Sequence, residues 1–151
     1  MSESMLVQDL KSNLGGRAVA VAQTAKNNIF VTVRPQDVPE ACRIVWHGMK
    51  SRFGIMTGID VVEGIELLYH FVFDEAHMVV TLKTIVPKPF PEIESITPVV
   101  PAAEWTEREI MDLLGVKFRK HPRPERLILA DDWPQGVYPL RKEFKPKDAN
   151  E

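Results

Sequence analysis

The strongest constraint on the fold is a block of three adjacent strand patterns between residues 53 and 86. The segments FGIMTGIDVV, GIELLYHFVFD and HMVVTLKTIV follow one another with short breaks, and β-branched and aromatic residues are frequent in them. DEA at 74–76 supplies the second turn. In the middle segment four large apolar residues alternate and so share one strand face: Leu67, Tyr69, Phe71 and Phe73. The block predicts a three-stranded meander.

The segments before this block add two helices and a hairpin. Residues 4–14 repeat leucine every fourth position and end at Gly15-Gly16, which predicts a helix. Residues 18–23 and 28–33 read as strands joined by a tight turn. Asp37 is the expected N-cap of a second helix, in which Cys42 is interpreted as a small buried hydrophobe.

A third helix follows the proline-rich break after residue 86. Thr106 is its expected N-cap, with Glu109 reaching back as in a capping box, and Gly115 ends it. Two side-chain pairs are expected to brace this helix: Trp105 with Ile110, and Arg108 with Asp112 at the surface. Because few β-α-β crossovers occur, the predicted fold class is α+β. We expect a single domain in which the hairpin and the meander form a mostly antiparallel sheet that is packed by helices.

Residues 1–120 form the predicted domain, and residues 121–151 form an extended, proline-rich tail. Prolines between Pro122 and Pro146 discourage regular structure, yet large apolar groups persist. Leaving each such group in water forfeits about 1.5–3 kcal/mol. The segment 127–129 is expected to fold back on the domain, and the last stretch to lie on a partner. The expected partner contacts, with Arg141 pairing to an acidic group, are Trp133, Tyr138, Pro139, Leu140, Arg141, Lys142 and Phe144.

Composition excludes several classes of function. The net charge of −2 argues against nucleic-acid binding, and no apolar run approaches the about 20 residues of a membrane helix. The single cysteine cannot alone hold an iron–sulfur cluster. The N-terminus lacks a signal-peptide pattern, so a cytoplasmic location is expected.

No catalytic motif stands out in the sequence. Neither a dinucleotide-binding nor a phosphate-binding glycine motif is present, and the acidic residues are scattered. His70 and His77 flank a hairpin that contains Asp74, so a small metal-dependent enzyme built on these three residues is one alternative. A free-standing protein-binding adaptor is another.

The third helix and the tail carry two motifs that resemble the 30 kDa subunit family of complex I, whose members are also called C subunits. EWTEREIMDLLGVKFRKHP and the closing YPLRKEF match its patterns, and the resemblance extends over about residues 58–144. Leu114, RPERL after the His-Pro pair, and Glu143 depart from the respiratory pattern. RLILADDWP is closer to energy-converting nickel–iron hydrogenases and formate hydrogenlyases. The first motif comprises Glu107, Arg108, Glu109, Asp112, Gly115, Phe118, His121 and Pro122.

The resemblance implies an accessory and assembly subunit in the peripheral arm of a membrane-bound oxidoreductase, either an NADH:quinone oxidoreductase or a related hydrogenase. It implies docking on the large catalytic subunit, close to the small iron–sulfur subunit, at the inner face of the cell membrane. It further implies that the complex couples electron transfer to ion translocation. This chain is implied to bind no cofactor and to have no active site of its own; the iron–sulfur clusters and the quinone site or nickel–iron centre lie in partner subunits.

Overall fold

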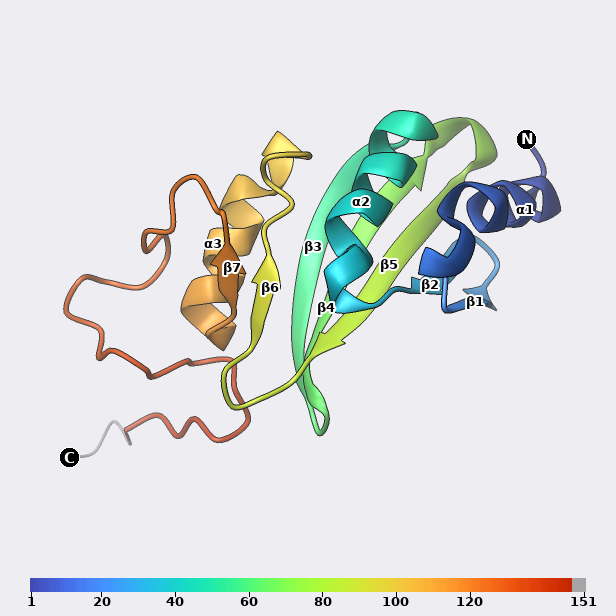
Figure 1. The fold of residues 1–151 in the computed structure, drawn as a ribbon. Coiled ribbons are helices and arrows are strands. Elements are labelled where there is room, and N and C mark those ends of the chain that lie inside the picture. The colour runs from blue at the N-terminus through green and yellow to red at the C-terminus, as the bar shows by residue number, and fades with distance from the viewer. Residues whose placement is uncertain (148–151) are drawn as a thin grey trace.

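The computed structural model describes residues 1–147 and contains a five-stranded sheet with the order β1-β2-β5-β4-β3 (Figure 1). The last four residues of the expected tail, 148–151, lie outside the described residues. The strands of this sheet are β1 (Ala20–Ala25), β2 (Asn28–Thr32), β3 (Arg52–Val61), β4 (Gly64–Phe73) and β5 (Met78–Val86).

The meander and the hairpin are confirmed. β4 pairs antiparallel with both β3 and β5, and β1 pairs antiparallel with β2. Residues 74–76 form a short 3-10 turn between β4 and β5. β2 joins the meander by parallel pairing with β5, which the sequence did not predict. This pairing unites two segments about 50 residues apart, and no local pattern specifies such a contact.

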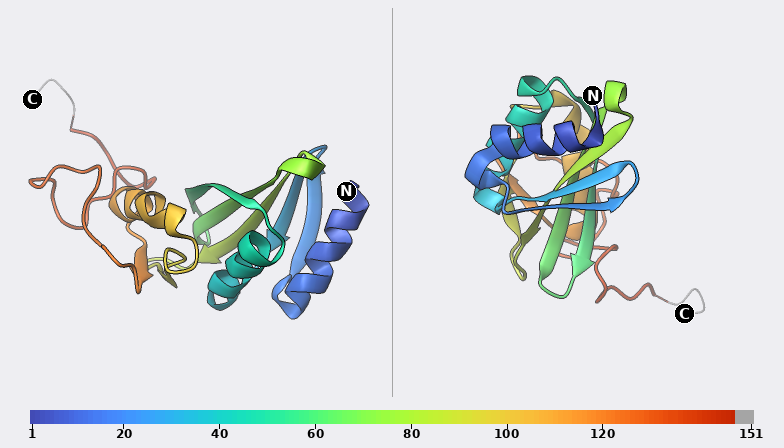
Figure 2. Two further views of the ribbon diagram at one scale, coloured as in Figure 1. Left: turned by 90° about the horizontal axis from the view of Figure 1, so that it is seen from above. Right: turned by 90° about the vertical axis from the view of Figure 1, so that its right-hand side faces the viewer.

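One face of the sheet holds the core. The alternating residues of β4 predicted to share a face are all buried there. The helix α1 (Glu3–Leu14) buries Leu6, Leu10 and Leu14, as expected from their spacing. Figure 2 shows α1 and the second helix, α2 (Val38–Arg43), on the same side of the sheet.

The start of α2 differs from the prediction. A 3-10 turn, Pro35–Asp37, precedes the helix, and Asp37 makes no side-chain cap. Its carboxylate instead pairs with Arg34 at 2.7 Å, because the 3-10 turn places Asp37 in helical backbone geometry unlike that of a typical N-cap. A π-helical turn, Ile44–Gly48, extends the helix. Cys42 is fully buried, as predicted, and burial raises the pKa of its thiol.

The second half of the chain builds a smaller layer beside β3. β6 (Glu92–Glu94) and β7 (Lys117–Arg119) pair in parallel, and the third helix, α3 (Glu104–Leu114), connects them. Neither strand was predicted, because each has three residues and both lie next to prolines or helix ends. α3 packs on β3 at Gly58, where a Cβ atom would lie 2.6 Å from Leu114.

The start of α3 also corrects the prediction. The helix begins at Glu104, so Thr106 lies within its first turn and donates its hydroxyl hydrogen to the Ala103 carbonyl at 3.1 Å. Trp105 is 66% exposed and lies within the first turn of the helix, so it does not hold the position before the cap that a staple with Ile110 requires. The cap moves because the 3-10 turn Pro101–Ala103 starts helical geometry before the threonine. Gly115 ends the helix in left-handed geometry, as predicted. Within residues 1–147, no helix is long and apolar enough to cross a membrane.

Candidate functional site

The centre of the candidate site is Glu107, which is completely buried in α3. Its carboxylate accepts hydrogen bonds from the Ser95 hydroxyl at 2.5 Å and the Ile96 backbone N–H at 2.7 Å. The Thr97 hydroxyl donates to the same carboxylate at 3.3 Å. Glu107 therefore fastens the segment that follows β6 to the helix.

Burial and hydrogen bonding act on Glu107 in opposite directions. Removal from water disfavours the charged carboxylate, whereas the donors from residues 95–97 favour it. Burial is the larger effect and raises the pKa of Glu107 to about 7. A proton thus binds Glu107 within the physiological range.

His121 lies beside this carboxylate, with its Nε2 atom 3.8 Å from the Glu107 carboxylate. Nε2 is 3.1 Å from the Glu104 carbonyl oxygen, and the Arg123 backbone N–H donates to Nδ1 at 3.0 Å. Because Nδ1 accepts a hydrogen bond, Nε2 carries the proton and the ring is neutral. His121 therefore fixes the turn that leaves β7 against the start of α3.

Arg108 and Asp112 are buried and bind the tail instead of pairing with each other. The Arg108 guanidinium donates to the backbone carbonyls of Glu125 and Arg126 at 2.9 and 3.0 Å. One oxygen of Asp112 accepts three successive backbone N–H bonds of 2.8–3.1 Å from residues 127–129. The expected surface ion pair is wrong, while the expected folding back of 127–129 is confirmed.

The final stretch of the tail also lies on its own domain. The Leu140 backbone N–H donates to the Leu113 carbonyl, and Arg141 Nε donates to the Leu114 carbonyl at 2.8 Å. The Arg141 guanidinium lies 4.8 Å from the centre of the Tyr138 ring. Arg141 thus completes the C-terminus of α3 through the Leu114 carbonyl, and its guanidinium also lies 3.7 Å from the Glu143 carboxylate. Its pairing with an acidic group of a partner stays a prediction. Leu140 itself is 58% exposed.

Other predicted residues divide between the interior and the surface. Phe118 is buried in β7, whereas Glu109 and Pro122 are exposed. Trp133 donates its ring N–H to the Val137 carbonyl and packs on Phe144, with ring centres 6.0 Å apart. The remaining predicted contacts are Pro139, which is half-buried, and Lys142, which is exposed.

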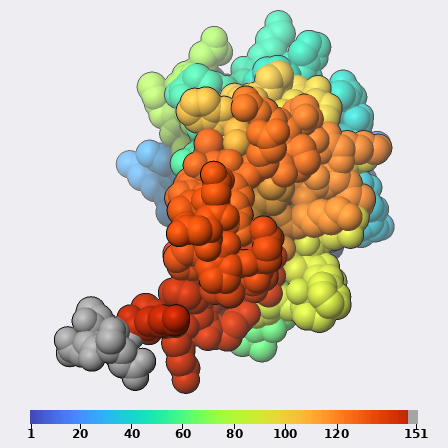
Figure 3. Space-filling model, turned by 90° about the vertical axis from the view of Figure 1, so that its left-hand side faces the viewer, coloured from blue at the N-terminus to red at the C-terminus, as the bar shows by residue number. Residues whose placement is uncertain are grey.

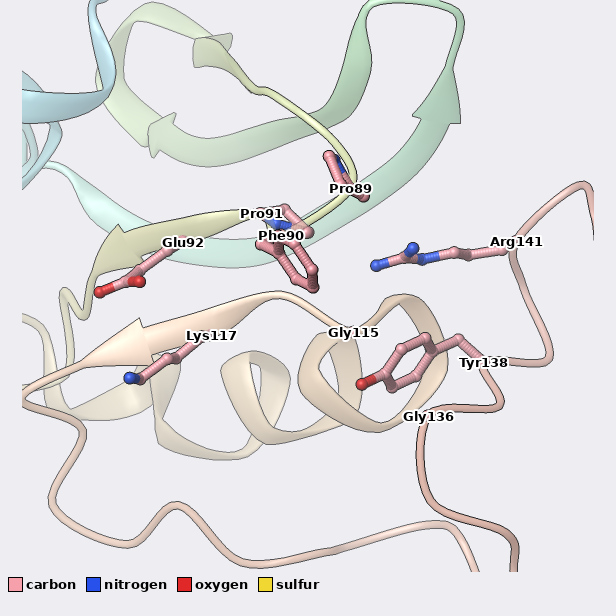
Figure 4. Close-up of a pocket in the computed structure, with 9 residues that line it drawn as sticks. All are labelled: Pro89, Phe90, Pro91, Glu92, Gly115, Lys117, Gly136, Tyr138 and Arg141. Atoms are coloured by element: carbon pink, nitrogen blue, oxygen red, sulfur yellow. The ribbon is translucent and has the colours of Figure 1, made fainter.

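A pocket of about 420 Å³ lies between the loop after β5 and the tail (Figure 4). Figure 4 shows the Phe90 and Tyr138 rings and the Arg141 guanidinium around it. Sequence reasoning missed Phe90, because its neighbouring prolines indicated only the end of the meander. Phe90 is 89% exposed.

Gly115 is expected to be intolerant of a side chain. Its φ of 74° suits glycine, and a Cβ atom would overlap the Tyr138 ring. Gly115→Ala should lower the free energy of unfolding by about 2–4 kcal/mol, from backbone strain plus displacement of the ring. Gly136→Ala is the matched control, because φ is 77° there but the surrounding space is open. Equal denaturant midpoints for the two variants would contradict the packing of Tyr138 on the helix end.

The residues of the alternative metal site are not brought together. His70 hydrogen-bonds through both ring nitrogens, at 3.1 Å to Thr57 and 2.8 Å to Thr81. Asp74 pairs with Arg52 at 2.8 Å. Across the described residues no three His, Cys, Asp or Glu side chains are grouped as metal ligands. The geometry therefore gives no support to a metal-dependent enzyme at this hairpin.

The fold and the site define a class: a small α+β domain whose buried polar motif holds its own tail in place. The profile described as "Respiratory-chain NADH dehydrogenase, 30 Kd subunit" matches residues 31–150. The chain therefore belongs to the 30 kDa subunit family of respiratory-chain NADH dehydrogenases. This confirms the resemblance seen in the two sequence motifs.

Relatives come from both branches that the sequence suggested. The C subunit of NADH-quinone oxidoreductase from Salinispora tropica is 29% identical, covering 85% of this chain and 55% of the relative. Formate hydrogenlyase subunit 5 of Escherichia coli is 32% identical, covering 95% of this chain and 26% of the relative. The chain thus spans about half the length of the NADH-quinone oxidoreductase subunit and about a quarter of the length of the formate hydrogenlyase subunit.

A solved structure shares the fold closely. It is described as the membrane-bound sulfane sulfur reductase, an archaeal respiratory membrane complex. The matching chain superposes with a TM-score of 0.80 at 26% identity, covering 94% of this chain and 85% of that chain.

Proposed function

We propose that this chain is an accessory and assembly subunit of a complex I-like, membrane-bound oxidoreductase, and that it docks on the large catalytic subunit. The small iron–sulfur subunit is the proposed neighbour. In this proposal, the chain binds no redox cofactor, and the electron carriers reside in its partners. It lies at the inner face of the membrane only through the complex.

The observation that carries this proposal is the tail in its ordered position. Glu107, Arg108 and Asp112 use their polar groups within the chain, so the family motif builds a rigid platform. Apolar side chains such as Ile128 and Leu140 remain exposed on that platform. A preorganised apolar surface lowers the entropy cost of binding a partner protein.

The hydrogenase branch is the favoured form of the complex. The formate hydrogenlyase relative covers 95% of this chain, compared with 85% for the NADH-quinone relative. The segment 127–135 resembles the hydrogenase side in sequence, and Asp112 anchors its first three residues, 127–129. Electron transfer coupled to ion translocation would then be the activity of the whole complex.

Affinity purification of the tagged chain from its own host tests the proposal. We expect large and small iron–sulfur subunits in equal amounts with the chain, and no iron or flavin in the chain once it is separated from them. A stable monomer that recruits neither subunit would favour the free-standing adaptor. Iron or flavin retained by the separated chain would contradict the accessory role.

Truncation after Gly136 tests the role of the tail. We expect recovery of the large subunit to fall at least tenfold, because Leu140 and its neighbours are lost. The lone domain should stay folded, since the sheet and α3 precede the cut. Its stability should still fall by about 1–3 kcal/mol without the Arg141 contact to α3. Unchanged recovery, measured beside thermal unfolding of the lone chain, would place the interface elsewhere.

A further inference from the structure

The two most exposed large apolar side chains of the described residues lie at one end of the molecule. Val62, at the tip of the β3–β4 hairpin, is 91% exposed, and Phe90, in the loop after β5, is 89% exposed. Leu140 of the tail is 58% exposed. Figure 1 shows the hairpin tip, this loop and the tail together below the sheet, and in Figure 3 they meet at the lower edge of one face. We call residues 61–64, 87–91 and 138–145 the hairpin end.

The hairpin end is held together by one buried carboxylate. Asp60, only 4% exposed, forms an ion pair with Lys88 and accepts a 2.9 Å hydrogen bond from the Lys142 backbone N–H. The pKa of Asp60 is below its ordinary value, mainly because of the hydrogen bond from Lys88 and, to a lesser extent, because of the bond from the Lys142 backbone. Gly64 packs so closely on the Val86 carbonyl that a Cβ atom would overlap it. The three segments therefore form one preorganised surface.

The charges of the hairpin end indicate the chemistry of a partner. The tail contributes the exposed cations Lys142 and Lys145. Exposed carboxylates are also present, Glu63 next to Val62 and Glu143 next to Lys142. An anionic lipid surface would be repelled by these carboxylates where the apolar groups must insert. A protein groove is compatible with both signs, because each charge meets a local partner.

We propose that the hairpin end is a docking surface for a partner protein with an apolar groove, whose rim carries carboxylates opposite Lys142 and Lys145 and cations opposite Glu63 and Glu143. Phe90 is its main anchor, and Val62 and Leu140 are further apolar contacts. The pocket beside Phe90 would receive an apolar side chain of the partner between the Phe90 and Tyr138 rings (Figure 4). This inference rests on the proposed function in one respect: the partner is taken to be the large subunit of the same complex.

Photo-crosslinking in the assembled complex tests this surface. A photoreactive phenylalanine analogue at position 90 should give a covalent adduct with the large subunit. The matched control is position 105, where Trp105 is 66% exposed and lies outside the hairpin end. Adducts with lipid, or no protein adduct from position 90 in an intact complex, would overturn the docking surface. If no complex assembles around the unlabelled chain, it is the proposed function that fails.

Substitutions measure the contribution of each part in a binding assay with the purified large subunit. We expect Phe90→Ala to weaken binding at least tenfold, as is typical of a buried aromatic anchor. Trp105→Ala should leave the affinity within about twofold. Lys142→Glu with Lys145→Glu should weaken binding and reduce its dependence on salt. Equal effects of the Phe90 and Trp105 substitutions would overturn the assignment of the anchor.

Discussion

Replacement of Glu107 by alanine is expected to lower the free energy of unfolding by about 3–5 kcal/mol. This loss is larger than the one expected for Gly115→Ala or Asp112→Ala. The substitution leaves a cavity and removes the acceptor of three donors, from Ser95, Ile96 and Thr97. Water has no access to this site in the folded domain, because Glu107 is completely buried. The measurement is the denaturant midpoint of the isolated chain at pH 7.

Glu107→Gln is the matched control, because it keeps the shape and one carbonyl acceptor. We expect it to cost about 1–2 kcal/mol below pH 4.5, where both side chains are neutral. Glu109→Ala is the second control, since Glu109 belongs to the same motif but is exposed. It should change stability by less than about 0.5 kcal/mol. A similar midpoint for the Glu107→Ala and Glu109→Ala variants would contradict the buried network.

The raised pKa of Glu107 adds a dependence on pH. Between its ordinary value of 4.5 and about 7, the folded chain holds a proton that the unfolded chain has released. The contribution of this group to stability is therefore greatest below pH 4.5, falls as pH rises to about 7, and is then constant. The stability of the wild type relative to Glu107→Gln should fall by about 3 kcal/mol across this range, so the glutamine variant should be the more stable of the two near pH 7. A constant difference would show that the carboxyl ionises normally.

Local patterns account for the parts of the fold that could be predicted. The alternation in β4 and the leucine repeat of α1 each specify a buried face by themselves. The parallel pairing of β2 with β5 has no such signal, because both strands read alike whichever neighbour they select. β7 is too short to show a period, although Phe118 within it is buried.

The candidate site was found by its motif, but its geometry was misjudged. Arg108 and Asp112 are four residues apart, which is the spacing of an exposed helical ion pair. One available signal pointed the other way: Glu107 shares the helix face of Ile110 and Leu114, at spacings of three and four. A carboxylate on an apolar stripe must find donors in the interior. What those donors are depends on residues 95–97, whose position follows from tertiary packing.

The last consequence concerns Asp112, whose loss is expected to release the tail. Asp112→Ala removes the acceptor of three backbone N–H groups in residues 127–129, and the domain should lose about 2–4 kcal/mol. Limited trypsin digestion provides a local measure of this release. Cleavage after Arg126 should become at least tenfold faster, because opening of the segment is controlled by these bonds. Asp112→Asn, which retains one acceptor oxygen, should give an intermediate rate.

Asp132→Ala is the control for charge alone, because Asp132 is an exposed carboxylate of the same tail. It should leave both cleavage and stability unchanged. Faster cleavage in Asp112→Ala with full recovery of the large subunit would show that the partner does not need the anchored tail. Slow cleavage in that variant would instead mean that Arg108 and the contacts near Arg141 hold the segment without Asp112. We expect Asp112→Ala to show both faster cleavage and lower recovery of the large subunit. The reason is that the motif on α3 fixes the path by which Leu140 reaches the hairpin end.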